Sequence, residues 1–135
     1  MADRFSKPLD APLFERMVIV GVGLIGSSLL RAARQRNLVK TLVAADMSEA
    51  VCARVREIGI ADEVFQDAKA AVQGADLIIL CTPVGCIGDV AAQIAPHLAN
   101  GAILSDVGSV KASVVAAVQP HLSDKVHFIP AHPVA

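Results

Sequence analysis

Strand-like runs and segments of helical periodicity alternate along almost the whole of this 135-residue chain. The short, mostly apolar runs are residues 16–21, 41–46, 62–65, 76–81, 102–106 and 126–130. The segments of helical spacing between them are residues 24–36, 49–58, 67–72, 87–98 and 110–122. Two adjacent parallel strands need a connection of helix length. The alternation therefore predicts an α/β fold, a doubly wound parallel sheet with helices on both faces.

The composition supports a single aliphatic core and argues against two classes of partner. Hydrophobic residues make up 54% of the chain and aromatic residues only 3%. A net charge of −1, with acids and bases scattered, gives no electrostatic reason to expect nucleic acid or an anionic membrane surface. The apolar runs are also far shorter than the roughly 20 residues of a membrane-spanning helix.

The cysteines and the chain ends bear on location and domain organisation. Cys52, Cys81 and Cys86 form no CxxC pair and lie in otherwise apolar segments, so we expect free, buried thiols in a reducing compartment, the cytoplasm.

Residues 1–15 contain no apolar signal-peptide centre and are expected to form a loosely ordered leader to a single domain at 16–135. The chain stops just after its last predicted strand, which suggests that a further domain is missing.

Three glycines follow the first predicted strand and open the first predicted helix, in the pattern Gly21-x-Gly23-x-x-Gly26. In a dinucleotide-binding turn the first glycine permits a tight bend and the second lets the backbone approach a pyrophosphate. The third lets helix and strand pack closely, and the helix N-terminus attracts the phosphates. The same glycines could serve only a tight turn. The residues predicted to bind the phosphates are Gly21, Gly23, Leu24, Ile25 and Gly26.

An acidic residue at the end of the second predicted strand favours the cofactor-binding interpretation. Asp46 follows Gly26 by about twenty residues, where a carboxylate can accept hydrogen bonds from both ribose hydroxyls and repel a 2′-phosphate. Capping of the next helix is the alternative, but Ser48 is available for that role. Neither Met47 nor Ser48 offers a cation for a 2′-phosphate, so the expected cofactor is NAD rather than NADP.

A Thr-Pro pair ends the strand predicted at 76–81. Thr82 and Pro83 would lie where the strand order of a Rossmann-type sheet, 3-2-1-4-5-6, reverses direction and forms the ligand crevice. We expect them to line the nicotinamide side of the cofactor. The alternative is that Pro83 simply begins the next helix.

Four segments together resemble the prephenate/arogenate (cyclohexadienyl) dehydrogenases of tyrosine biosynthesis. They are the glycine-rich VGVGLIGSSL, LCTPV at 80–84, SDVGSVK at 105–111 and PAHPVA at 130–135. The resemblance runs from about Arg16 to the end of the chain. It implies a catalytic histidine at His132, with Ser109 beside it and the nicotinamide.

The resemblance also implies a reaction, the NAD-dependent oxidative decarboxylation of prephenate and/or arogenate. A hydride leaves the hydroxyl-bearing ring carbon for NAD⁺, carbon dioxide is lost, and the ring becomes aromatic. Imidazole has an ordinary pKa suited to polarising that hydroxyl. Each residue also has a simpler alternative role. His132 could be only a loop histidine, and Ser109 could be the N-cap of a helix that starts at Val110. Lys111 could be structural or face the solvent.

Members of this family carry a helical C-terminal domain that forms the homodimer and closes the cleft. We expect that domain to be absent from this chain and the isolated polypeptide to be inactive. Two other functions remain open from the sequence: another two-domain hydroxy-acid dehydrogenase, and a regulatory module that binds NAD without catalysis. We assign no metal ligands.

Overall fold

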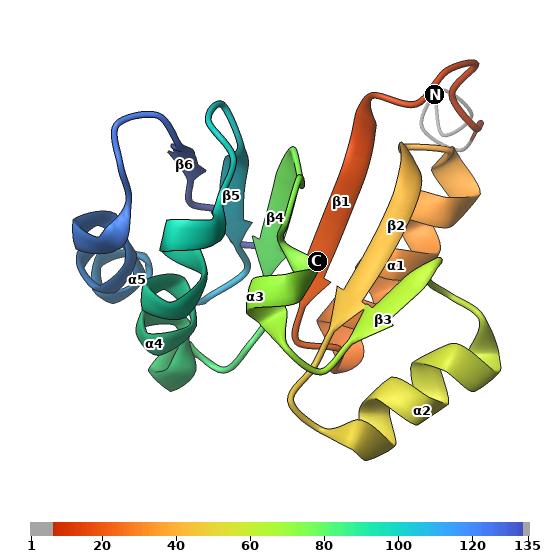
Figure 1. The fold of residues 1–135 in the computed structure, drawn as a ribbon, viewed down its shortest axis with the longest axis horizontal. Helices are drawn as coiled ribbons and strands as arrows, with labels where there is room; N and C mark the ends of the chain where they lie inside the picture. The colour runs from red at the N-terminus through yellow and green to blue at the C-terminus, as the bar shows by residue number, and fades with distance from the viewer. Residues whose placement is uncertain (1–6, 134–135) are drawn as a thin grey trace.

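The computed structural model describes residues 7–133 and forms a six-stranded, wholly parallel sheet in the order β3-β2-β1-β4-β5-β6 (Figure 1). The strands are β1 Phe14–Val20, β2 Val39–Ala45, β3 Glu63–Phe65, β4 Leu77–Leu80, β5 Ile103–Asp106 and β6 His127–Ile129. The α-helices are α1 Leu24–Arg36, α2 Glu49–Ile58, α3 Ala68–Ala71, α4 Val84–Ile94 and α5 Lys111–Val118. Two 3₁₀ turns, η2 Ala95–His97 and η3 Gln119–His121, follow α4 and α5. The predicted fold class and strand order are confirmed.

The sheet separates two apolar layers, as expected when alternate strand residues face opposite sides. On one face, Met17, Ile19 and Leu42 pack with Leu30 of α1 and Val55 of α2. On the other face, side chains of β1, β2, β4 and β5 pack with α3, α4 and α5. None of the helices among residues 7–133 is long and apolar enough to cross a membrane.

Local signals fix the ends of the first two α-helices. Helix α1 has the predicted bounds. Helix α2 begins after Ser48, whose hydroxyl accepts a hydrogen bond from Val51 N at 3.3 Å, and ends at Gly59, which has a φ of 74°. A left-handed glycine after the last helical residue is a common way to end a helix. The predicted capping role of Ser48 is confirmed.

The bounds of two helices, α4 and α5, differ from those predicted from the sequence. Helix α4 starts at Val84 rather than at residue 87, because Pro83 occupies its N-cap position with a φ of −53° that suits entry into a helix. Helix α5 starts at Lys111 rather than at Val110, and it gives way to a 3₁₀ turn containing Pro120. Proline lacks the amide hydrogen that would continue an α-helix.

The N-terminal boundary of the folded domain also differs from the predicted boundary at residue 16. Strand β1 begins at Phe14, inside the segment expected to be a leader. Leu9 N and Leu13 N donate to the carbonyls of Arg36 and Leu38 at 2.9 Å, so this segment is hydrogen-bonded at the end of α1. Residues 1–6 lie outside the described part of the chain.

Replacing the α2 cap should lower the stability of the domain. Ser48→Ala leaves the Val51 amide without its side-chain acceptor, and we expect the free energy of unfolding to fall by about 0.5–2 kcal/mol. The matched control is Ser28→Ala, because Ser28 lies within α1 and its hydroxyl bonds only to Leu24 O. The control should leave the urea midpoint unchanged or raise it slightly, and equal losses in both variants would contradict the capping role.

Candidate functional site

A cavity of about 740 Å³ opens at the edge of the sheet where the parallel strands end. Its volume lies within the roughly 300–1,000 Å³ typical of small-molecule sites. The predicted cofactor residues that line it are Gly21, Gly23, Leu24, Ile25, Asp46, Thr82 and Pro83. They come from the ends of β1, β2 and β4, which lie side by side. The position corresponds to the point where the strand order reverses.

The three glycines differ in what surrounds them. Gly21 has a φ of 91°, and a Cβ there would lie 2.9 Å from backbone atoms of Cys81 and Thr82. A Cβ on Gly26 would lie 2.1 Å from Gly21 O, so only glycine allows α1 to pack this closely on the turn. Gly23, by contrast, has no protein atom within 4 Å of the position of a Cβ. Its bare backbone faces open space in the cavity wall, as the approach of a phosphate requires.

Asp46 connects the glycine turn to the start of α2. Its Oδ2 accepts a hydrogen bond from Val22 N and its Oδ1 accepts one from Ser48 N, both at 2.9 Å. Each carboxylate oxygen has two lone pairs, so these bonds leave acceptor capacity on a residue that lines the cavity. Asp46 thus supports the local turn and remains able to accept ligand hydroxyls.

Thr82 supplies an unpaired polar group in the cavity wall. Its Oγ1 is buried and has no hydrogen-bond partner among the described residues. A buried hydroxyl without a partner is unfavourable, so this residue of the cavity wall retains hydrogen-bonding capacity that the described protein groups do not use. Pro83, next to it, lines the cavity and also forms the N-cap of α4, the alternative role considered for it. Its place on the nicotinamide side stays a prediction.

Two cysteines lie in the wall of this cavity. Burial, together with the negative charge of Asp106, raises the pKa of the Cys81 thiol to about 12, so this thiol is protonated at physiological pH. Cys52 is buried, but Cys81 is only partly buried and Cys86 is exposed, which corrects the expectation that all three cysteines are buried. Cys86 lies in the first turn of α4, which begins at Val84.

Part of the cavity wall was not predicted from the sequence. The segment after β3 supplies Gln66, Asp67 and Ala68, and α4 supplies Val90 and Gln93. The rule that parallel strands end at one edge could have found the first group, because Phe65 ends a strand next to β2. No local pattern marks the α4 residues as cavity-lining.

Ser109 and His132 do not line the cavity but follow the ends of the next two strands, β5 and β6. Both residues are exposed. The alternative role of Ser109 as the N-cap is wrong: Val110 occupies that position and no side chain caps α5. The two segments meet where Lys111 Nζ donates to Ala131 O at 2.5 Å. Of the PAHPVA motif, Val134 and Ala135 lie outside the described residues.

The parallel sheet, the glycine turn, the carboxylate after β2 and the cavity at the strand-order reversal define a Rossmann-type nucleotide-binding domain. The family model for the prephenate dehydrogenase nucleotide-binding domain matches residues 29–135. The chain belongs to this family.

Named relatives agree with that assignment. The chain is 42% identical over 123 residues to a cyclohexadienyl dehydrogenase of Zymomonas mobilis, covering 91% of this chain and 42% of that protein. It is 34% identical to a prephenate dehydrogenase of Lactococcus lactis, covering 90% of this chain and 34% of that protein. The chain therefore spans less than half the length of these relatives.

Solved structures show the same fold. An arogenate dehydrogenase of Synechocystis superposes with a TM-score of 0.78 at 34% identity, over 87% of this chain and 40% of that one. A prephenate dehydrogenase of A. aeolicus, in complex with hydroxyphenyl propionate and NAD⁺, superposes with a TM-score of 0.79 at 24% identity, over 89% and 42% of the two chains.

The glycine geometry predicts opposite results for two matched substitutions. Gly26→Ala forces its methyl group into Gly21 O, so we expect the free energy of unfolding to fall by about 1–3 kcal/mol or more. Gly23→Ala meets no protein atom and should cost less than about 1 kcal/mol. Urea unfolding of the two variants measures the difference, and a Gly26→Ala protein as stable as the parent would contradict the described packing.

Proposed function

We propose that this chain is the NAD-binding domain of a prephenate or arogenate dehydrogenase. The observation that carries the proposal is the cavity at the strand-order reversal, whose wall combines the open backbone of Gly23, the carboxylate of Asp46 and the unpaired hydroxyl of Thr82. The names of the family and of its relatives support the choice of reaction.

The residues present fit a dinucleotide. The backbone at Gly23, Leu24 and Ile25 would hold the pyrophosphate, because the N-terminus of α1 carries free amide groups and a partial positive charge. Asp46 would accept the ribose hydroxyls, and its charge disfavours a 2′-phosphate, so NAD is preferred over NADP. Thr82 and Pro83 would line the nicotinamide side.

The catalytic step would take place at the carboxyl ends of β5 and β6, which Ser109 and His132 follow. Bound NAD⁺ would supply the hydride acceptor. His132 would take up the proton of the substrate's ring hydroxyl as the hydride leaves the same carbon, and loss of carbon dioxide would then make the ring aromatic. Ser109, which caps no helix, would orient the imidazole. A regulatory module that only binds NAD needs neither residue.

The full-length gene product, in this proposal, is a cytoplasmic homodimer whose second domain completes the substrate site. The proposal is supported by the greater length of the matched relatives. Recognition of the carboxylates of prephenate or arogenate would belong to that second domain. The 135-residue chain by itself should therefore bind the cofactor without oxidising the substrate.

Cofactor binding tests the first half of the proposal. We expect NAD⁺ to raise the melting temperature of the 135-residue chain more than NADP⁺ does, with no NADH formed when prephenate is added. Asp46→Ala removes a charged acceptor worth about 1.5–3 kcal/mol, so NAD⁺ affinity measured by calorimetry should fall about ten-fold or more and the preference over NADP⁺ should narrow.

Asp89→Ala is the matched control, because Asp89 is an exposed carboxylate of α4 that does not line the cavity. It should bind NAD⁺ as the parent does. Undiminished affinity in the Asp46 variant would assign that residue to the support of the turn and α2 alone.

The turnover of a His132 variant tests the catalytic part of the proposal. In the full-length gene product, His132→Asn should lower turnover of prephenate or arogenate by about 10²–10⁴-fold, the usual range for a positioned acid–base group. NAD⁺ affinity and melting temperature should stay close to those of the parent, because His132 is exposed and outside the cavity. Normal turnover in this variant would reject the mechanism.

A further inference from the structure

Asp106, the last residue of β5, has an unusual position for a charged side chain. It is completely buried, and it is the only buried charged residue in the part of the chain that the structure describes. Burial of a carboxylate is strongly unfavourable unless the group is paired and hydrogen-bonded. The contacts that compensate its burial therefore indicate what Asp106 holds in place.

Three donors from two different segments converge on this carboxylate. Oδ2 accepts from Gly108 N at 2.8 Å and forms a short ion pair with Lys111 Nζ, both from the loop and first turn that follow β5. Oδ1 accepts from Ala131 N at 3.3 Å, from the segment that follows β6. The buried charge thus joins the loop that carries Ser109 to the segment that carries His132.

Lys111 completes the connection. Its ammonium group contacts Asp106 and also donates to Ala131 O at 2.5 Å. Ala131 is therefore held at both of its backbone groups, the amide by Asp106 and the carbonyl by Lys111. That carbonyl belongs to the peptide bond that leads into His132, so the pair fixes the position from which the imidazole projects.

We propose that Asp106 and Lys111 are positioning residues that hold His132 beside Ser109. This inference rests on the catalytic role proposed for His132. Neither residue lines the cofactor cavity, so the pair acts on the substrate edge and not on NAD⁺ binding. Catalytic groups must be placed accurately, and a displacement of about 1 Å can cost about 10²-fold in rate.

The test uses Lys111→Met, because Lys111 is partly exposed, whereas Asp106→Asn alters a fully buried group and risks unfolding the domain. In the 135-residue chain, hydrogen exchange of the Ala131 amide, followed by NMR, should become at least ten-fold faster. Amides of β1 and β4 should accelerate much less than that of Ala131, because their exchange reports only the general loss of stability from leaving the Asp106 carboxylate without its cation. NAD⁺ affinity should stay within two-fold. Lys111→Arg keeps the charge and should restore most of the protection.

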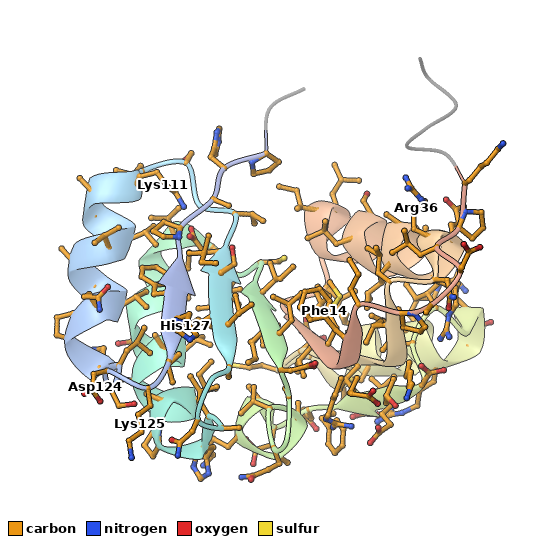
Figure 2. All side chains as sticks on the ribbon, turned by 90° about the horizontal axis from the view of Figure 1, so that it is seen from above. Phe14, Arg36, Lys111, Asp124, Lys125 and His127 are labelled. Carbon is orange, nitrogen blue, oxygen red and sulfur yellow. The ribbon has the colours of Figure 1, made fainter. Side chains whose placement is uncertain are left out.

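Lys125→Met is the control. Lys125 is an exposed lysine that precedes β6, and Figure 2 shows Lys111 and Lys125 near opposite ends of that strand. The control should leave Ala131 exchange unchanged. If Lys111 served only to stabilise α5, Lys111→Met would speed exchange along α5 and not at Ala131, and that result would overturn the inference.

Turnover of the full-length gene product then separates this inference from the proposed function. Lys111→Met should lower kcat by about ten- to a hundred-fold with an unchanged KM for NAD⁺, and Lys111→Arg should recover part of the loss. Unchanged kcat together with a large loss in His132→Asn would overturn the positioning role while leaving the proposed function intact. Full turnover in His132→Asn would reject the proposed function, and Ala131 exchange would still report whether Lys111 anchors this segment.

Discussion

The close packing of α1 on the turn after β1 sets the geometry of the whole cofactor edge. A Cβ at Gly26 would lie 2.1 Å from Gly21 O, and one at Gly21 would meet the backbone after β4 at 2.9 Å. These two approaches bring the end of β1, the start of α1 and the end of β4 together. The N-terminus of α1 can face the cavity only because both positions lack a side chain.

The carboxyl edge of the parallel sheet has two distinct regions. The strands around β1 end at the cavity, where Asp46 bridges the glycine turn and α2. Beyond β4, the buried carboxylate of Asp106 connects the segments after β5 and β6. In the proposed enzyme the first region holds the cofactor and the second holds the acid–base group. One edge supports both because all six strands run in the same direction.

The sequence was most informative where local physics decides the structure. The bounds of α1 followed from periodicity, and the cap of α2 followed from the residue type of Ser48. The alternation of elements predicted the parallel sheet, and the strand order was the one usual for a Rossmann-type sheet. Periodicity placed the start of α4 three residues too late, because Pro83 occupies the N-cap position. The burial of Cys86 was inferred from its apolar neighbours in the sequence, and this inference was wrong.

The link between Lys111 and Ala131 was not predictable in the same way. The two residues are 20 positions apart, and their contact depends on a buried charge that only the packed sheet creates. Periodicity likewise could not decide whether Ser109 caps a helix, because a shift of one residue in the start of α5 changes the answer.

The central claim is that the cavity at the strand-order reversal binds NAD⁺. Titration of the ¹⁵N-labelled chain with NAD⁺, followed by amide chemical shifts, tests it most directly. We expect the largest shifts at Gly23, Leu24 and Thr82, with small changes at the opposite edge of the sheet near Gly101. Shifts confined to that opposite edge, or none at millimolar NAD⁺, would contradict the assignment of this cavity as the cofactor site.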